Sequence, residues 1–134
     1  MGVALLLVAG CGSSSDYANE RRPPRPRNIA VSVTDGRIGV APGEIGAGPV
    51  VLIVTNQSER SRDLRLAAPS GSGTACVDAD TSSGPINPMG TARVSVTLVQ
   101  GACVLTTGSA SGPRPATLRV GPERPSAQAD LMQP

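Results

Sequence analysis

The chain has 134 residues, with 12 Lys+Arg against 10 Asp+Glu and a formal net charge of +2. All 12 cationic side chains are Arg, and His, Trp and Phe are absent. Without His or Lys, the chain has no imidazole metal ligand, no histidine base, no Schiff-base lysine and no P-loop lysine. Its remaining carboxylates are scattered, so no catalytic constellation is expected and the chain is predicted not to be an enzyme.

The apolar residues make up 39% of the chain and are concentrated in short Val, Ile and Leu runs. A core without aromatics depends on aliphatic side chains, each contributing roughly 1.5–3 kcal/mol when fully buried. A domain of about ninety residues built in this way is expected to be marginally stable, so a covalent cross-link would stabilise its fold.

The first eleven residues predict a lipoprotein signal. Residues 3–10 form an apolar run before Cys11, and this run is far shorter than the roughly twenty residues that span a membrane. Val8, Ala9 and Gly10 before Cys11 resemble the bacterial lipobox, in which a peptidase cleaves before a Cys whose thiol carries the lipid. Residues 1–10 are therefore expected to be a signal peptide, and Cys11 the acylated, palmitate-bearing amino terminus.

Two observations bear on this prediction in opposite directions. Met1-Gly2 lack the basic residue with which signal peptides normally begin, so either the natural start lies upstream or the leader is shortened. The alternative is a chance apolar run before an ordinary Cys. Gly-Ser-Ser-Ser at 12–15 favours lipidation, because a flexible polar tether is expected after an acylated Cys. The predicted location is the outer face of the cell membrane, with membrane lipid as a partner through acylated Cys11.

Residues 11–28 are predicted to be a disordered tether that ends in a Pro/Arg-rich spacer at 20–27. Proline and mutually repelling Arg side chains favour an extended, semi-rigid backbone. The spacer is interpreted as a stalk, and the alternative, compatible with it, is attraction to anionic lipid or cell-wall polymer. Nucleic acid is not an expected partner, since there is no aromatic platform for stacking bases.

Apolar residues with a period of two predict strands throughout residues 29–121. In chain order these seven strands cover 29–33, 38–40, 50–54, 64–66, 92–98, 103–105 and 116–120. The run at 50–54 is typical of a central strand with both faces covered, and 92–98 is the clearest amphipathic strand. No window has helical spacing. The pattern predicts an all-β, Greek-key β-sandwich, cupredoxin-like or Ig-like, followed by a polar tail at 122–134.

The order of hydrophobic and turn residues resembles a cupredoxin-like domain. The resemblance lies in Val31–Asp35, Ile45–Val50, Val54–Asn56, Ile86–Pro88, Thr91–Gly101 and Pro115–Gly121. It implies that fold for residues 29–121. With the lipobox-like motif, the whole chain resembles a bacterial, actinobacterial-like lipoprotein, and Arg without Lys is interpreted as the mutational bias of a GC-rich genome.

The ligands of a blue-copper site are missing from this pattern. Such a site uses two His, one Cys and usually a weak axial Met. Ser58 to Asp63 stand where the resemblance implies the first His, and Thr106 or Thr107 where it implies the Cys. Cys103 falls on an inward core position, Met89 in a turn and Met132 in the tail. The resemblance therefore implies a scaffold without copper, and neither a metal nor another cofactor is expected.

Other candidate sites are interpreted as structural. Asp78 and Asp80 share one face of an extended segment and are expected to be solvated, because no calcium-loop pattern follows them. Gly43, Gly46 and Gly48 are predicted to occupy turn and bulge positions. The flexible loops at 70–73 and 108–112 are expected at the ends of the sandwich, where such folds bind partners.

Cys76 and Cys103 are predicted to form a disulfide. They are the only thiols left once Cys11 is acylated, and an exported protein lacks a reducing glutathione pool. The alternatives are two buried free thiols, or a two-thiolate metal site, which would leave the metal under-coordinated.

The sequence therefore predicts a membrane-anchored extracytoplasmic lipoprotein with a non-catalytic interaction or structural domain. Its partner would be a protein or a component of the cell envelope. The alternatives are a redox or metal-handling cupredoxin relative, and an accessory domain of an extracytoplasmic enzyme or transporter.

Overall fold

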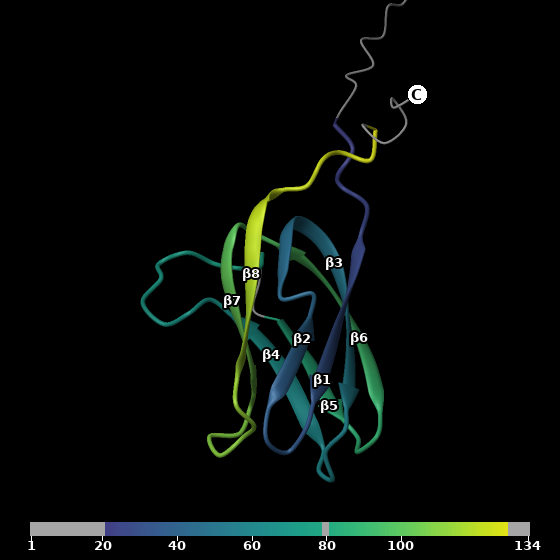
Figure 1. Cartoon of the computed structure of the whole chain (residues 1–134), viewed down its shortest axis with the longest axis vertical. Helices are drawn as coiled ribbons and strands as arrows, with labels where there is room; N and C mark the ends of the chain where they lie inside the picture. The colour runs from purple at the N-terminus through teal and green to yellow at the C-terminus, as the bar shows by residue number, and fades with distance from the viewer. Residues whose placement is uncertain (1–20, 79–80, 129–134) are drawn as a thin grey trace, which may run out of the picture.

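The computed structural model describes residues 21–78 and 81–128, and within them every regular element is a strand (Figure 1). The strands are β1 (Arg27–Val33), β2 (Ile38–Ala41), β3 (Glu44–Asn56), β4 (Arg62–Ala67), β5 (Thr81–Ile86), β6 (Thr91–Leu98), β7 (Gly101–Thr107) and β8 (Ala116–Glu123). All seven predicted strands are present. β5 was not predicted, because its Thr-Ser-Ser-Gly-Pro-Ile sequence lacks apolar alternation. Among the described residues, no helix could cross a membrane.

β3 belongs to both sheets of the sandwich. Its second half pairs in parallel with β1 and antiparallel with β6, and β2 extends this sheet beyond β1. Its first half, Glu44–Ala47, pairs in parallel with β8, and the second sheet continues through β7 and β4 to β5. The all-β sandwich predicted from the sequence is confirmed.

The core between the sheets is aliphatic, apart from the two cysteines. The buried apolar side chains are Ile29, Val31, Val33, Ile38, Ala47, Val50, Leu52, Val54, Leu64, Leu66, Cys76, Val77, Ile86, Leu98, Cys103, Leu105, Leu118 and Val120. The prediction that residues 50–54 are covered on both faces is wrong for the outer face. Val51 and Ile53 there are only half-buried; Val51 lies opposite Asn28 and Ser95, and Ile53 lies opposite Ala30 and Arg93.

The amphipathic strand predicted at 92–98 is β6, which lies at the edge of its sheet. Leu98 is buried, whereas Val94 and Val96 on the same inward face are half-buried. An edge strand has a neighbour on one side only, and this accounts for the incomplete burial.

The described part of the predicted tether, residues 21–28, is held against the C-terminal tail. The Ser126 hydroxyl donates to the Arg22 carbonyl at 2.6 Å, and the Ala127 N–H donates to the Pro23 carbonyl at 3.5 Å. Pro24 between them is buried. β1 begins at Arg27, two residues before the predicted domain start. The domain's first and last described segments therefore leave it together (Figure 1).

Arg124 lies where β3 changes sheets. Its Nε donates to the carbonyls of Gly46 and Ala47 at 3.2 and 3.3 Å, and its Nη2 to the carbonyl of Pro49. The predicted bulge is present, because the β3–β8 register shifts between Gly46 and Ala47. Gly48 has a φ of 128°, and a Cβ there would lie 3.0 Å from Arg124 Nη2. A side chain at Gly48 would thus be strained by its backbone and crowded by the guanidinium.

The predicted disulfide between Cys76 and Cys103 is confirmed, with Cα atoms 5.4 Å apart. Both cysteines are buried in the core. The Val99 N–H also donates to the Cys76 carbonyl at 2.9 Å, so the segment after the 68–75 loop is fixed to the β6–β7 turn by covalent and hydrogen bonds.

Replacing both core cysteines, as in Cys76→Ala with Cys103→Ala, is expected to lower the free energy of unfolding by about 3–4 kcal/mol. This is the chain-entropy value for a closed loop of 27 residues. Urea denaturation measures the change, and Cys11→Ser serves as the matched control that leaves stability unaltered. Two titratable thiols in the unreduced, denatured Cys11→Ser protein would contradict the cross-link.

Candidate functional site

Four connecting segments gather at the end of the sandwich opposite to the described start of the chain (Figure 1). They are residues 34–37, 57–61, 87–90 and 108–115. The resemblance places its first His at Ser58–Asp63, in the second segment and the start of β4, and its Cys at Thr106 or Thr107, at the end of β7 just before the fourth segment. This loop end is therefore the candidate functional site.

Asn56, at the end of β3, ties three parts of the loop end together. Its side-chain amide donates to the carbonyls of Arg60 at 2.7 Å and Ile86 at 2.9 Å. Its Oδ1 accepts the N–H and the hydroxyl of Ser58 at 3.0 and 2.7 Å. Asn56 and Ser58 are fully buried, so these bonds form away from water. Ser58 therefore holds the 57–61 loop to Asn56 through its backbone N–H and its hydroxyl.

Asp63 joins the second and fourth segments. The Gly108 N–H donates to Asp63 Oδ1 at 2.8 Å, and Arg65 Nε donates to Oδ2 at 3.0 Å. The Gly108 bond is the main reason that the pKa of Asp63 lies below its ordinary value of 3.8; partial burial opposes this effect and the Arg65 bond adds to it. β4 and β7 pair Leu64 with Thr107, so the structure brings Asp63, the last of the Ser58–Asp63 positions, beside the end of β7.

These residues do not fit copper. Thr107 carries a buried hydroxyl without a partner, but a Cβ at Gly112 would lie 2.3 Å from that oxygen. The 108–115 loop thus packs against this hydroxyl at Gly112, and a threonine stands where the copper site would need a thiolate. Cys103 is in the disulfide and Met89 is 77% exposed. Nor do residues 21–78 and 81–128 contain any group of three or more Cys, Asp or Glu side chains placed to hold a metal.

The loop end has contacts that the sequence analysis missed. Arg62 Nη2 lies 3.2 Å from Asp35 Oδ1, which links the 34–37 turn to β4. Arg114 exchanges backbone hydrogen bonds with Gly36 and Ile38 at 3.0 and 2.9 Å. No local pattern indicates either contact, because the partners are separated by long stretches of chain.

An open hollow of about 540 Å³ lies at this end, beside the ends of β4 and β7. Arg65, Arg114 and the backbone of the 106–113 segment line it. It offers cationic side chains, hydroxyls and loop backbone to a partner, and it is the largest of the hollows described here.

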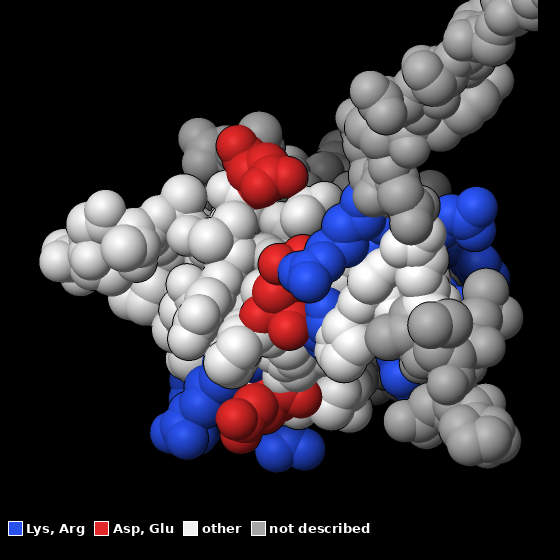
Figure 2. Space-filling model, turned by 90° about the horizontal axis from the view of Figure 1, so that it is seen from above, with Lys and Arg blue, Asp and Glu red and all other residues white. Residues whose placement is uncertain are grey.

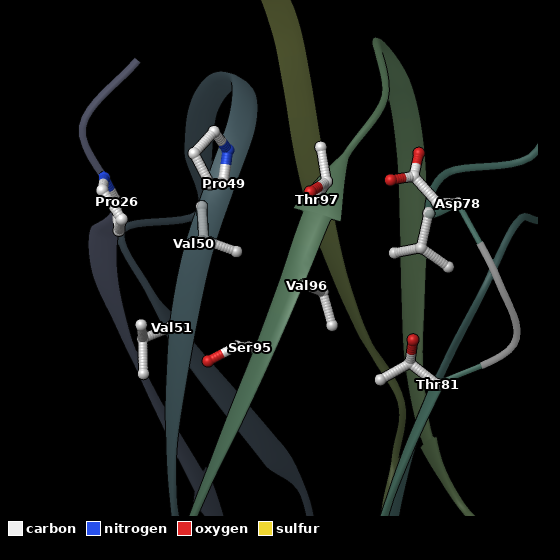
Figure 3. Close-up of a pocket in the computed structure, with 10 residues that line it drawn as sticks. Pro26, Pro49, Val50, Val51, Asp78, Thr81, Ser95, Val96 and Thr97 are labelled. Carbon is white, nitrogen blue, oxygen red and sulfur yellow. The ribbon is translucent and has the colours of Figure 1, made fainter. Parts of the chain in front are cut away.

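A second hollow, of about 370 Å³, lies between β6 and the segment that follows Cys76 (Figure 3). Val50 and Val96 contribute apolar surface, and exposed Asp78 and Thr97 contribute polar groups. Asp78 is solvated, as predicted, whereas Asp80 lies outside the described residues. The lipobox residues Val8, Ala9, Gly10 and Cys11, together with Met132, also lie outside them.

Comparison with solved structures supports the fold. Auracyanin A, a "blue" copper protein of Chloroflexus aurantiacus, superposes with a TM-score of 0.52 at 14% identity over 72% of this chain and 100% of its own. Auracyanin of Roseiflexus castenholzii superposes with a TM-score of 0.51 at 12% identity, over 72% of this chain and 97% of its own. Blue copper oxidase of Nitrosomonas europaea superposes with a TM-score of 0.50 at 14% identity. The match covers 81% of this chain and 43% of the oxidase.

Neither a protein-family model nor a curated protein sequence matches the chain. At such low identities, the structural likeness establishes the cupredoxin-like fold alone.

Replacing Asp63 by Asn should remove stability in a pH-dependent way. Because the folded pKa lies below 3.8, the charged carboxylate stabilises the fold above that pH, and its contribution is lost as the pH falls through the folded pKa. The difference in unfolding free energy between wild type and Asp63→Asn should therefore be largest at neutral pH and shrink in acid. Urea denaturation across this range tests it, with exposed Glu59→Gln as control; a pH-independent difference would contradict this assignment.

Proposed function

We propose that this chain is a lipid-anchored domain on the outer face of a membrane, which binds a protein or cell-envelope partner and catalyses no reaction. The observation that carries the proposal is the loop end, where Asn56, Ser58 and Asp63 use their polar groups to hold loops together. Their polar groups bond to groups of this same chain, and no imidazole or thiol stands at these positions to serve as a copper ligand.

The position of the described start of the chain is consistent with this proposal. The described chain begins at the end of the sandwich opposite to the loops (Figure 1). An anchor at Cys11, as the Val8-Ala9-Gly10 motif predicts, would leave the loop end facing away from the membrane. The open hollow beside Arg65 and Arg114 would then be presented to partners.

The redox alternative lacks a ligand set. The chain contains no His, and two of its three cysteines are joined in the core. The auracyanins and the copper oxidase are copper proteins by name, but their likeness to this chain extends to the fold and not to these ligands.

Replacing Cys11 by Ala should release the protein from the membrane fraction, because the thiol that would carry the lipid is then absent. Immunoblots of membrane and soluble fractions measure the distribution. Ser13→Ala, a similarly small change in the adjacent tether, is the control and should stay membrane-bound. Unchanged membrane retention of Cys11→Ala would refute the anchor.

Copper loading of the purified domain should produce no blue absorption and no stoichiometric tight binding. A chelator should likewise leave the thermal midpoint unaltered, since the fold is held by the core and the disulfide. Metal analysis after desalting and calorimetry with and without chelator make the measurements. One copper bound per chain, or a drop of several degrees, would overturn the metal-free assignment.

A further inference from the structure

Five Arg side chains gather around the described start of the chain: Arg21, Arg22, Arg25, Arg27 and Arg124, called here the basic face. Figure 2 looks onto this end and shows blue side chains where the grey N-terminal trace joins the domain. Glu123 lies beside Arg21 and Arg22, so these six residues together carry a charge of +4 (five Arg less one Glu); Figure 2 shows acidic side chains elsewhere on this face. Among the described residues, none of the five has a carboxylate within ion-pair distance; the two ion pairs present lie at the loop end.

A hollow of about 480 Å³ lies in the basic face. Arg25, Arg27 and Arg124 line it, together with three prolines. Arg25 and Arg27 are exposed, whereas Arg124 is half-buried. Cationic groups of three different residues therefore surround one open space, and no described acidic residue lines it.

The backbone of this hollow is fixed before any ligand arrives. Arg124 Nη1 donates to the Arg25 carbonyl at 2.7 Å, and the Ser126 hydroxyl holds the Arg22 carbonyl. Prolines on both segments restrict the backbone further. The exposed Arg side chains thus project from a rigid base, which reduces the ordering that binding requires.

Arg124 has N–H donors and a positive charge that are available to bind an anion. A guanidinium has five N–H donors. Arg124 uses three of them on backbone carbonyls through Nε, Nη1 and Nη2, which leaves two. Burial and the nearby charge of Arg27 lower the pKa of Arg124. An anion in the hollow would relieve this repulsion, and phosphate suits the planar fork of Arg.

We propose that this hollow binds the phosphate group of an anionic lipid headgroup. The membrane setting rests on the anchoring proposed above. Cys11 and Arg21 are ten residues apart (21 − 11), a length of chain that spans at most about 35 Å. The anchor would therefore hold the basic face within reach of the membrane surface, where each Arg is attracted to anionic lipid.

The test uses the proposed mature chain, residues 11–134 with Cys11→Ser, so that no acyl chain contributes to binding. It should sediment with vesicles containing phosphatidylglycerol and phosphatidylcholine, and not with phosphatidylcholine alone. Raising the salt from about 0.1 M to about 1 M, which shortens the Debye length from about 10 to 3 Å, should release it. The double change Arg25→Gln with Arg27→Gln should weaken binding about tenfold or more.

Arg60→Gln with Arg93→Gln is the matched control, since it removes two exposed charges away from the basic face. Circular dichroism and thiol titration of each variant verify the fold. No binding to phosphatidylglycerol vesicles, or equal weakening by both double variants, would overturn the proposal. Release by inorganic phosphate at the concentration of lipid phosphate would overturn the lipid assignment in favour of a soluble ligand. Because the anchor is absent from this assay, its outcome is independent of the Cys11→Ala fractionation.

Discussion

The passage of β3 from one sheet to the other is the constraint on which the architecture depends. A strand that changes partners leaves carbonyl groups without a ladder at the crossing, and a buried carbonyl without a hydrogen bond costs about 1–3 kcal/mol. At this crossing the Arg124 side chain donates to the carbonyls of Gly46, Ala47 and Pro49, and the Arg124 backbone N–H also donates to the Ala47 carbonyl at 3.1 Å. Since Arg124 directly follows β8, the same side chain ties the end of the second sheet to the beginning of the first.

The loop end is organised by polar side chains at or beside the positions where the sequence resemblance implies metal ligands. Asn56 uses both ends of its amide within the protein, and Asp63 accepts a backbone N–H from a segment 45 residues away. Hydrogen bonds to charged groups contribute roughly 1.5–3 kcal/mol and neutral ones about 1 kcal/mol. Several bonds of this kind can fix the relative positions of loops without a metal ion.

Local pattern predicted the strands whose side chains alternate, such as β6, and failed for β5. In β5, the Ser83 hydroxyl accepts the Leu64 N–H at 2.8 Å. A pattern of alternating apolar residues cannot predict such a contact. The disulfide could be predicted by elimination, because only two thiols were left. The roles of Arg124 and Asp63 could not, since both depend on pairings between segments that are distant in sequence. The loop-end positions could be placed only through the family resemblance.

The hydrogen bonds between the first and last described segments also determine how the domain carries a mechanical load. Tension applied at Arg21 reaches the Ser126 hydroxyl and Arg124 through the carbonyls of Arg22 and Arg25 before it reaches β1. The force is thereby divided between β1 and β8, which belong to different sheets. β1 is in turn held along its length by parallel pairing with β3 from Arg27 to Val33, so that a pull along the strand loads these bonds in shear and all at once.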